Sequence, residues 1–111
     1  MLCSILVRRL KEGAGYDDFH RAWFPDQGFG VPARVRNALR VDDPRELLSV
    51  GFVDLPVAEL AAGLERVAAA EKARHDRIAQ VIESTRLTGI YEVVDDYDFS
   101  STPRRTPNPG L

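Results

Sequence analysis

The chain has 111 residues, enough for one domain with a single hydrophobic core. Hydrophobic residues make up 44% of it and charged residues 29%, a balance typical of a folded domain rather than a disordered one. The net charge of −2 offers no basic field for nucleic acid, and no apolar run reaches the roughly 20 residues of a membrane span, so neither partner is expected.

Residues 3–10 are apolar and β-branched at their centre, which predicts a first strand. Cys3, at its start, is the single cysteine of the chain. It cannot form an internal disulfide, and this usage favours a reducing, cytoplasmic setting.

Residues 16–24 predict the first helix, because aromatic residues and a histidine recur there at one helical face. The residues on this face are Tyr16, Phe19, His20, Trp23 and Phe24. Asp17 and Asp18 lie in the first turn, where the helix dipole favours acidic groups, and Pro25 fits a helix that ends at or before Phe24. The glycine-rich loop that follows, residues 26–32, is a candidate lid.

Two strands are predicted next. Residues 33–41 alternate apolar residues with Arg34, Arg36 and Arg40, which share the other face of the strand. Residues 42–45 read as a turn, and residues 47–53 as a strand that is apolar on both faces and therefore central.

The second half of the chain predicts helical segments and a last strand. Asp54 is expected to cap a helix with an apolar stripe through Leu60, Leu64 and Val67. Residues 68–72 either continue this helix or break it, and residues 74–84 are again helical. Residues 87–97 alternate as a strand, and residues 99–111, with three prolines, read as a flexible tail.

This order of elements predicts an α+β, ferredoxin-like βαββαβ domain over residues 1–98, followed by the Pro-rich C-terminal tail, residues 99–111. Right-handed crossovers would place the first and third strands in the middle of a four-stranded antiparallel sheet and the second and fourth at its edges. A lone sheet of this kind leaves one face uncovered, which a two-fold partner would cover.

The segment from residue 3 to about residue 97 resembles the dimeric α+β barrel superfamily, nearest to antibiotic-biosynthesis monooxygenases and EthD-like small proteins. The stretches that carry the likeness are SILVRRL, YDDFHRAW, LLSVGFVDLP and RLTGIYEVVDDYDF. The resemblance implies a homodimer whose two sheets form a barrel. It also implies a cofactor-independent enzyme, monooxygenase- or cyclase-like, that acts on an aromatic or polyketide-type metabolite. The rival is a non-catalytic homodimer of the same fold that binds a ligand or a partner.

Within that expectation His20 is the candidate catalytic base, because an apolar setting would keep its imidazole neutral. Tyr16 and Trp23 would shape the pocket for a small aromatic ligand, and Arg36 would hold an enolate or phenolate. The alternatives are a half-buried His20 bonded to a carbonyl or water, and aromatic residues that serve only the core. For Arg36 they are a solvated face or a pair with Glu92 across a dimer.

His75 resembles the helical histidine that binds haem iron in haem-degrading members of the superfamily. The accompanying asparagine of the first strand and the tryptophan before the histidine are missing, so haem is not expected. His20 and His75 form no HxxxH or HExxH motif, and we expect neither a metal nor another cofactor. His75 otherwise reads as a surface residue beside Glu71.

Overall fold

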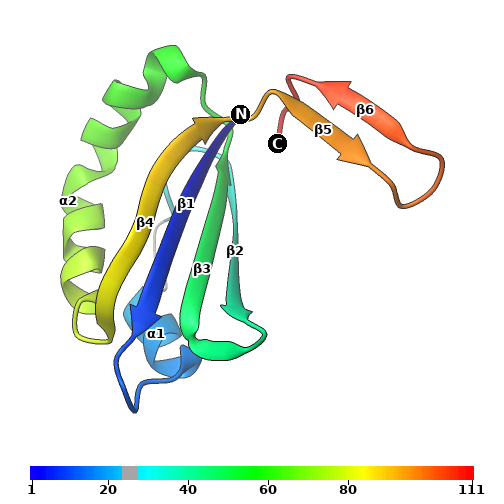
Figure 1. The fold of residues 1–111 in the computed structure, drawn as a ribbon. Coiled ribbons are helices and arrows are strands. Elements are labelled where there is room, and N and C mark those ends of the chain that lie inside the picture. The colour runs from blue at the N-terminus through cyan, green and yellow to red at the C-terminus, as the bar shows by residue number, and fades with distance from the viewer. Residues whose placement is uncertain (24–27) are drawn as a thin grey trace.

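In residues 1–23 and 28–111, which the computed structural model describes, four strands form one antiparallel sheet and both α-helices cover the same face of it (Figure 1). The elements in chain order are β1 (Leu2–Leu10), α1 (Tyr16–Trp23), β2 (Ala33–Arg40), β3 (Asp43–Val53), the short 3₁₀ helix η1 (Val57–Glu59), α2 (Leu60–Ile78), β4 (Ile82–Glu92), β5 (Asp95–Asp98) and β6 (Arg104–Pro107).

The sheet has the strand order β2-β3-β1-β4, and each neighbouring pair is antiparallel. The predicted placing of β1 and β3 in the middle is therefore correct, and the α+β arrangement is compatible with a ferredoxin-like fold. β3 begins earlier than predicted, because β2 and β3 are joined by a tight turn in which Arg40 pairs with Asp43. The predicted end of the first helix at Phe24 lies outside the described residues.

α2 is one continuous helix, so of the two alternatives for residues 68–72 the one that continues the helix is correct. The second half of the chain departs from prediction in two places. Residues 82–84 belong to β4 and not to a helix. Asp54 caps neither helical element, since the N-cap positions are Pro56 for η1 and Glu59 for α2, without side-chain hydrogen bonds. Among the described helices, none has the length and hydropathy to cross a membrane.

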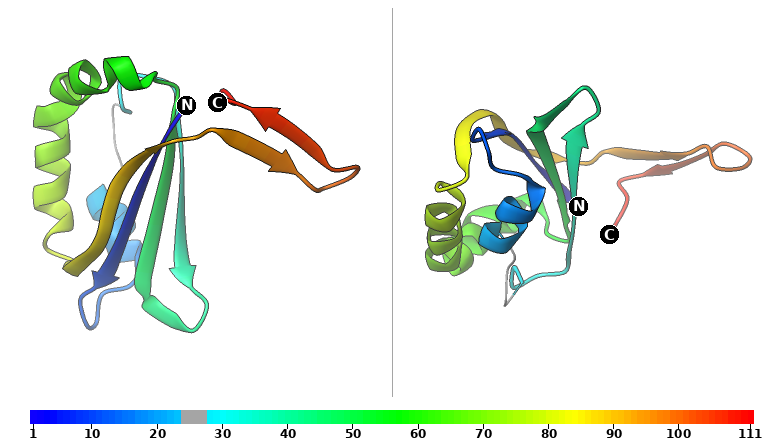
Figure 2. Two further views of the ribbon diagram at one scale, coloured as in Figure 1. Left: turned by 45° about the horizontal axis from the view of Figure 1, so that its top comes forward. Right: turned by 90° about the horizontal axis from the view of Figure 1, so that it is seen from below.

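The C-terminal segment forms a hairpin where a tail was expected. β5 pairs antiparallel with β6, and the predicted boundary after Asp98 falls inside this hairpin. Ion pairs from Asp95 to Arg105 (2.6 Å) and from Asp98 to Arg104 (3.6 Å) join its two strands. The hairpin extends away from the sheet and helices in all three views (Figures 1 and 2).

The core lies between the sheet and the two helices at one end of the domain. Its fully buried members are Leu10 of β1, Phe19 of α1 and Leu47 of β3, joined by Ile78 of α2. Phe19 is thus a core residue, as expected if the aromatic residues of the first helix serve the core. Towards the other end of the domain, the space between α2 and the sheet is not filled by side chains, and a cavity opens there.

Candidate functional site

A cavity of about 200 Å³ lies between the sheet and α2. Alternating residues of β1, β2 and β3 form its floor, namely Leu2, Ser4, Leu6, Arg8, Ala33, Val35, Ser49, Gly51 and Val53. Leu64, Val67 and Ile78 of α2 lie over it, and Phe29 and Val31 of the loop after α1 close one side. An engineered apolar cavity of ~150 Å³ accepts benzene, so this one has room for a somewhat larger ring system.

Arg8 brings a positive charge into this largely apolar cavity. Its side chain comes from the floor strand β1, and the residue is only 5% exposed. Its Nη2 donates to the Ser49 hydroxyl at 3.1 Å, and its guanidinium lies 5.1 Å from the centroid of the Phe19 ring. Burial lowers the pKa of Arg8, since desolvation penalises the charged form. The Nε of Arg8 has no hydrogen-bond partner among residues 1–23 and 28–111.

A chain of hydrogen bonds leads from Arg8 to the first helix. The Ser49 hydroxyl donates to Asn37 Oδ1 at 2.7 Å, and Asn37 Nδ2 donates to the Tyr16 hydroxyl at 3.2 Å. The chain crosses β1, β3, β2 and α1, and it fixes Ser49 beneath the guanidinium. Tyr16 therefore acts on the cavity through Asn37 and Ser49 and does not line it.

Arg74 is the second buried arginine of the cavity wall. It comes from α2, is 5% exposed, and lies 4.7 Å from the centroid of the Phe29 ring. One turn earlier in the same helix, Glu71 forms an ion pair with it. This carboxylate neutralises the guanidinium of Arg74, although the Nε of Arg74 also has no hydrogen-bond partner in the part of the chain that the structure describes.

His75 follows Arg74 and also faces the cavity. Its Nε2 lies 3.6 Å from Glu71 Oε2, and 59% of its side chain is exposed. A second, more open cavity of about 390 Å³ lies between the end of α2 and β4. Both cavities are lined by Leu6, Arg8, His75 and Ile78, so His75 and Arg8 stand where the two adjoin.

The residues predicted for the site are only partly brought together. Trp23 lines the cavity and stacks on Phe19 at 6.1 Å between ring centroids. His20 is exposed, lines neither cavity, and lies 6.4 Å from the Tyr16 ring. The expected burial of His20 is wrong, because α1 directs Phe19 into the core and leaves position 20 at the rim of its apolar face.

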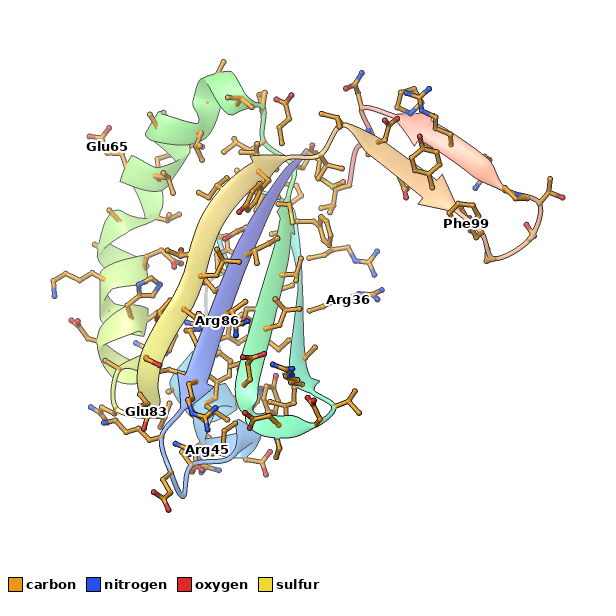
Figure 3. All side chains as sticks on the ribbon, viewed as in Figure 1. Arg36, Arg45, Glu65, Glu83, Arg86 and Phe99 are labelled. Atoms are coloured by element: carbon orange, nitrogen blue, oxygen red, sulfur yellow. The ribbon has the colours of Figure 1, made fainter. Side chains whose placement is uncertain are left out.

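Arg36 is exposed and lies on the opposite face of the sheet from the cavity. It alternates with Val35, which lines the cavity, and it extends away from β2 (Figure 3). The predicted pairing of Arg36 with Glu92 is not favoured by the register. Glu92 pairs with Leu2, a cavity residue, and so shares the helix-covered face.

Sequence reasoning missed Arg8, Ser49 and Arg74. A usable signal for Arg8 existed, since it shares the parity of Leu6 and Leu10 and must therefore face the helices with them. In the described residues, no group of three or more His, Cys, Asp or Glu side chains is placed to hold a metal ion. Comparisons with protein-family models, curated proteins and solved structures give no match.

Proposed function

We propose that this chain is a small enzyme, monooxygenase- or cyclase-like, that acts on an aromatic or polyketide-type metabolite without a cofactor. The observation that supports the proposal most is the cavity between the sheet and α2. It is mostly apolar and of a size for a ring system, and a few polar side chains converge on it, among them Arg8, Ser49 and His75. The resemblance to the dimeric α+β barrel superfamily points to the same class of substrate.

The acid–base group that geometry favours is His75 rather than His20. His75 lines both cavities, and the Glu71 carboxylate, 3.6 Å from its Nε2, would stabilise the imidazolium that forms when His75 takes a proton. In this proposal His75 accepts a proton from a phenol, or from a carbon next to a carbonyl, and the resulting anion reacts with dioxygen or closes a ring. Trp23 borders the ring system of the substrate.

Two matched variants test this assignment. His75→Gln and His20→Gln each remove one imidazole from an exposed position, so both should fold. We expect His75→Gln to lower turnover of a screened polyphenol roughly 10²- to 10⁴-fold, the usual contribution of a general base, and His20→Gln to leave it unchanged. Loss of turnover in His20→Gln alone would return the base role to His20.

The second candidate function is ligand binding without chemistry in a homodimer of the same fold. A wild-type protein that binds ring compounds in the cavity but turns over none of a broad phenol and polyketide panel would favour it. Both candidates share the dimer, which we propose from two features of the described surface.

The first feature is the uncovered face of the sheet. The register places apolar residues of β3, β1 and β4 in three rows across it: Phe52, Cys3 and Tyr91; Val50, Ile5 and Gly89; Leu48, Val7 and Leu87. Neither helix covers these rows, and Tyr91 and Leu87 remain 49% and 44% exposed. A contiguous apolar face of this kind marks an interface, and a second copy of the same face would cover it.

The second feature is the projecting hairpin. Tyr97 and Phe99 stack at 6.3 Å between ring centroids and are 55% and 71% exposed. A two-stranded hairpin with nothing beneath it is marginally stable in water. In the proposed dimer the hairpin rests on the other copy, which buries its aromatic side.

The dimer is tested by Val50→Asp, which puts a charge in the middle row of the uncovered face. We expect the variant to be monomeric in light scattering at micromolar concentration, where the wild type is dimeric. Glu65→Lys, a charge change on the outer side of α2, is the control and should leave the mass unchanged (Figure 3). A monomeric wild type would contradict the dimer.

A further inference from the structure

The cavity holds two buried guanidinium groups in unlike electrostatic settings. Arg74 has the carboxylate of Glu71 beside it. Arg8 has only the neutral hydroxyl of Ser49 and the ring of Phe19, and it forms no ion pair with any carboxylate of the described residues. The two residues are equally buried, at 5% exposure each. The difference between them is therefore one of charge compensation and not of burial.

An uncompensated buried cation is costly, because the interior replaces its hydration with too few hydrogen bonds. Arginine does not escape this cost by losing its proton. In the described residues its Nε–H also has no acceptor, which adds a second unsatisfied group. An anionic oxygen in the cavity would compensate the charge of the guanidinium.

We propose that Arg8 is the anion anchor of the cavity, and that the ligand is an organic anion whose apolar ring fills the remaining space while its carboxylate or enolate oxygen contacts the Arg8 guanidinium. The proposal rests on the proposed function, since it names the chemistry of the ligand that this cavity takes. Ser49, held by Asn37, keeps the guanidinium in place, and the Phe19 ring supports its flat side.

The surroundings favour a singly charged ligand over a phosphate. Among the described residues, the charged ones that line the cavity are Arg8, Arg66, Glu71 and Arg74, of which Glu71 and Arg74 neutralise each other and Arg66 is exposed. One buried, unneutralised guanidinium remains, which matches one negative charge. The Ser4 hydroxyl and the Trp23 indole N–H also line the described part of the wall, but these donors are neutral and add no second positive charge for a dianion.

The test compares two probes of nearly equal shape, 2-naphthoate and its neutral amide, 2-naphthamide, by calorimetry on the full chain. Trp23 is the only tryptophan and lines the cavity, so its fluorescence reports binding independently. We expect the wild type to bind naphthoate roughly 10- to 100-fold more tightly than naphthamide, as for a charge-assisted hydrogen bond.

Arg8→Gln should abolish this preference while leaving naphthamide binding within about twofold, since glutamine keeps a donor but no charge. Arg66→Gln, an exposed arginine at the same cavity, is the matched control and should retain the preference. Equal affinity of the wild type for both probes, or a preference that survives Arg8→Gln, overturns the anchor alone. Binding of neither probe contradicts the proposed function and the anchor together.

A melting temperature measured without ligand tests whether Arg8 has a purely structural role. Arg8→Met removes the uncompensated charge and keeps much of the side-chain volume. The anchor predicts a melting temperature equal to or a few degrees above that of the wild type, because residues kept for binding often cost stability. A clear fall in melting temperature would assign Arg8 to the fold and overturn the proposal.

Discussion

Arg8 and Arg9 are neighbours in β1, yet the pleat of the strand sends them to opposite faces of the sheet. Arg9 lies on the face without helices, where its Nη1 is 2.9 Å from Asp43 and its Nε is 3.4 Å from Glu83. The hydrogen bond with Asp43 raises the pKa of Arg9, whereas burial lowers the pKa of Arg8. Two identical side chains thus have opposite electrostatic settings one residue apart.

The comparison separates structural charges from functional ones. On the uncovered face, Arg9, Arg40 and Arg86 each have a carboxylate within reach, from Asp42, Asp43, Glu46 or Glu83. Figure 3 shows Arg45 and Glu83 at the end of the sheet near α1. On the covered face Arg8 has none among the described residues. Of the two buried arginines, Arg8 is the one that no carboxylate of the described residues compensates, which makes it the candidate for a ligand.

The largest expected effect comes from removing the ring beneath Arg8. Phe19→Ala deletes a fully buried aromatic side chain that packs with Leu10 and Leu47. We expect the free energy of unfolding to fall by about 3–5 kcal/mol, measured by urea denaturation. A loss below about 1 kcal/mol would mean that the site collapses around the missing ring, and that the support assigned to Phe19 is not needed.

A smaller effect should follow when Arg74 is given the setting of Arg8. Glu71→Gln removes the carboxylate beside Arg74 and leaves a neutral group, as Ser49 is for Arg8. We expect about 1–3 kcal/mol of lost stability and tighter binding of 2-naphthoate, since the cavity then holds two uncompensated cations. Glu65→Gln, on the outer side of α2, is the control and should change neither quantity. Unchanged affinity for naphthoate would show that charge compensation does not govern this cavity.

The smallest effect concerns Asp43 on the uncovered face. The hydrogen bond from Arg9 holds the pKa of the Asp43 carboxyl below its usual range, so the fold favours the carboxylate. Its contribution to stability is present above about pH 4 and is lost as the pH falls through the lowered pKa. Asp43→Asn should therefore be slightly less stable than the wild type at pH 7 and equal to it near pH 2. A gap that stays constant between these pH values would contradict the role of the ion pair.

The sheet could be predicted from the sequence because period-two patterns and short turns determine it locally. β1 and β2 lie close to where the sequence pattern placed them, β3 begins before the predicted residue 47, and β1 and β3 are central. The start of β4 was mistaken for helix, because the spacing of Ile78 and Ile82 suits one helical face. In the structure both residues reach the same core from different elements, Ile78 from α2 and Ile82 from β4.

The candidate site was harder to predict, since it depends on which charged residues the fold encloses. Trp23 was found through its helical spacing, but His20 lies just off the buried side of a two-turn helix and is exposed. The burial of Arg74 depends on how α2 crosses the sheet. The contact between Arg74 and Phe29 depends on the path of the loop that carries Phe29, and no sequence pattern specifies that path. Such long-range placement is not encoded in any local motif of the chain.

The most direct test of the anion anchor is an NMR titration that follows the Nε–H resonances of the arginines. On addition of 2-naphthoate, we predict a shift of the Arg8 Nε–H resonance as the anion pairs with the guanidinium, a smaller response at Arg74, and none at Arg9. 2-Naphthamide should leave the Arg8 resonance nearly unmoved. An Arg8 signal that stays in place while Trp23 reports naphthoate binding would contradict the account.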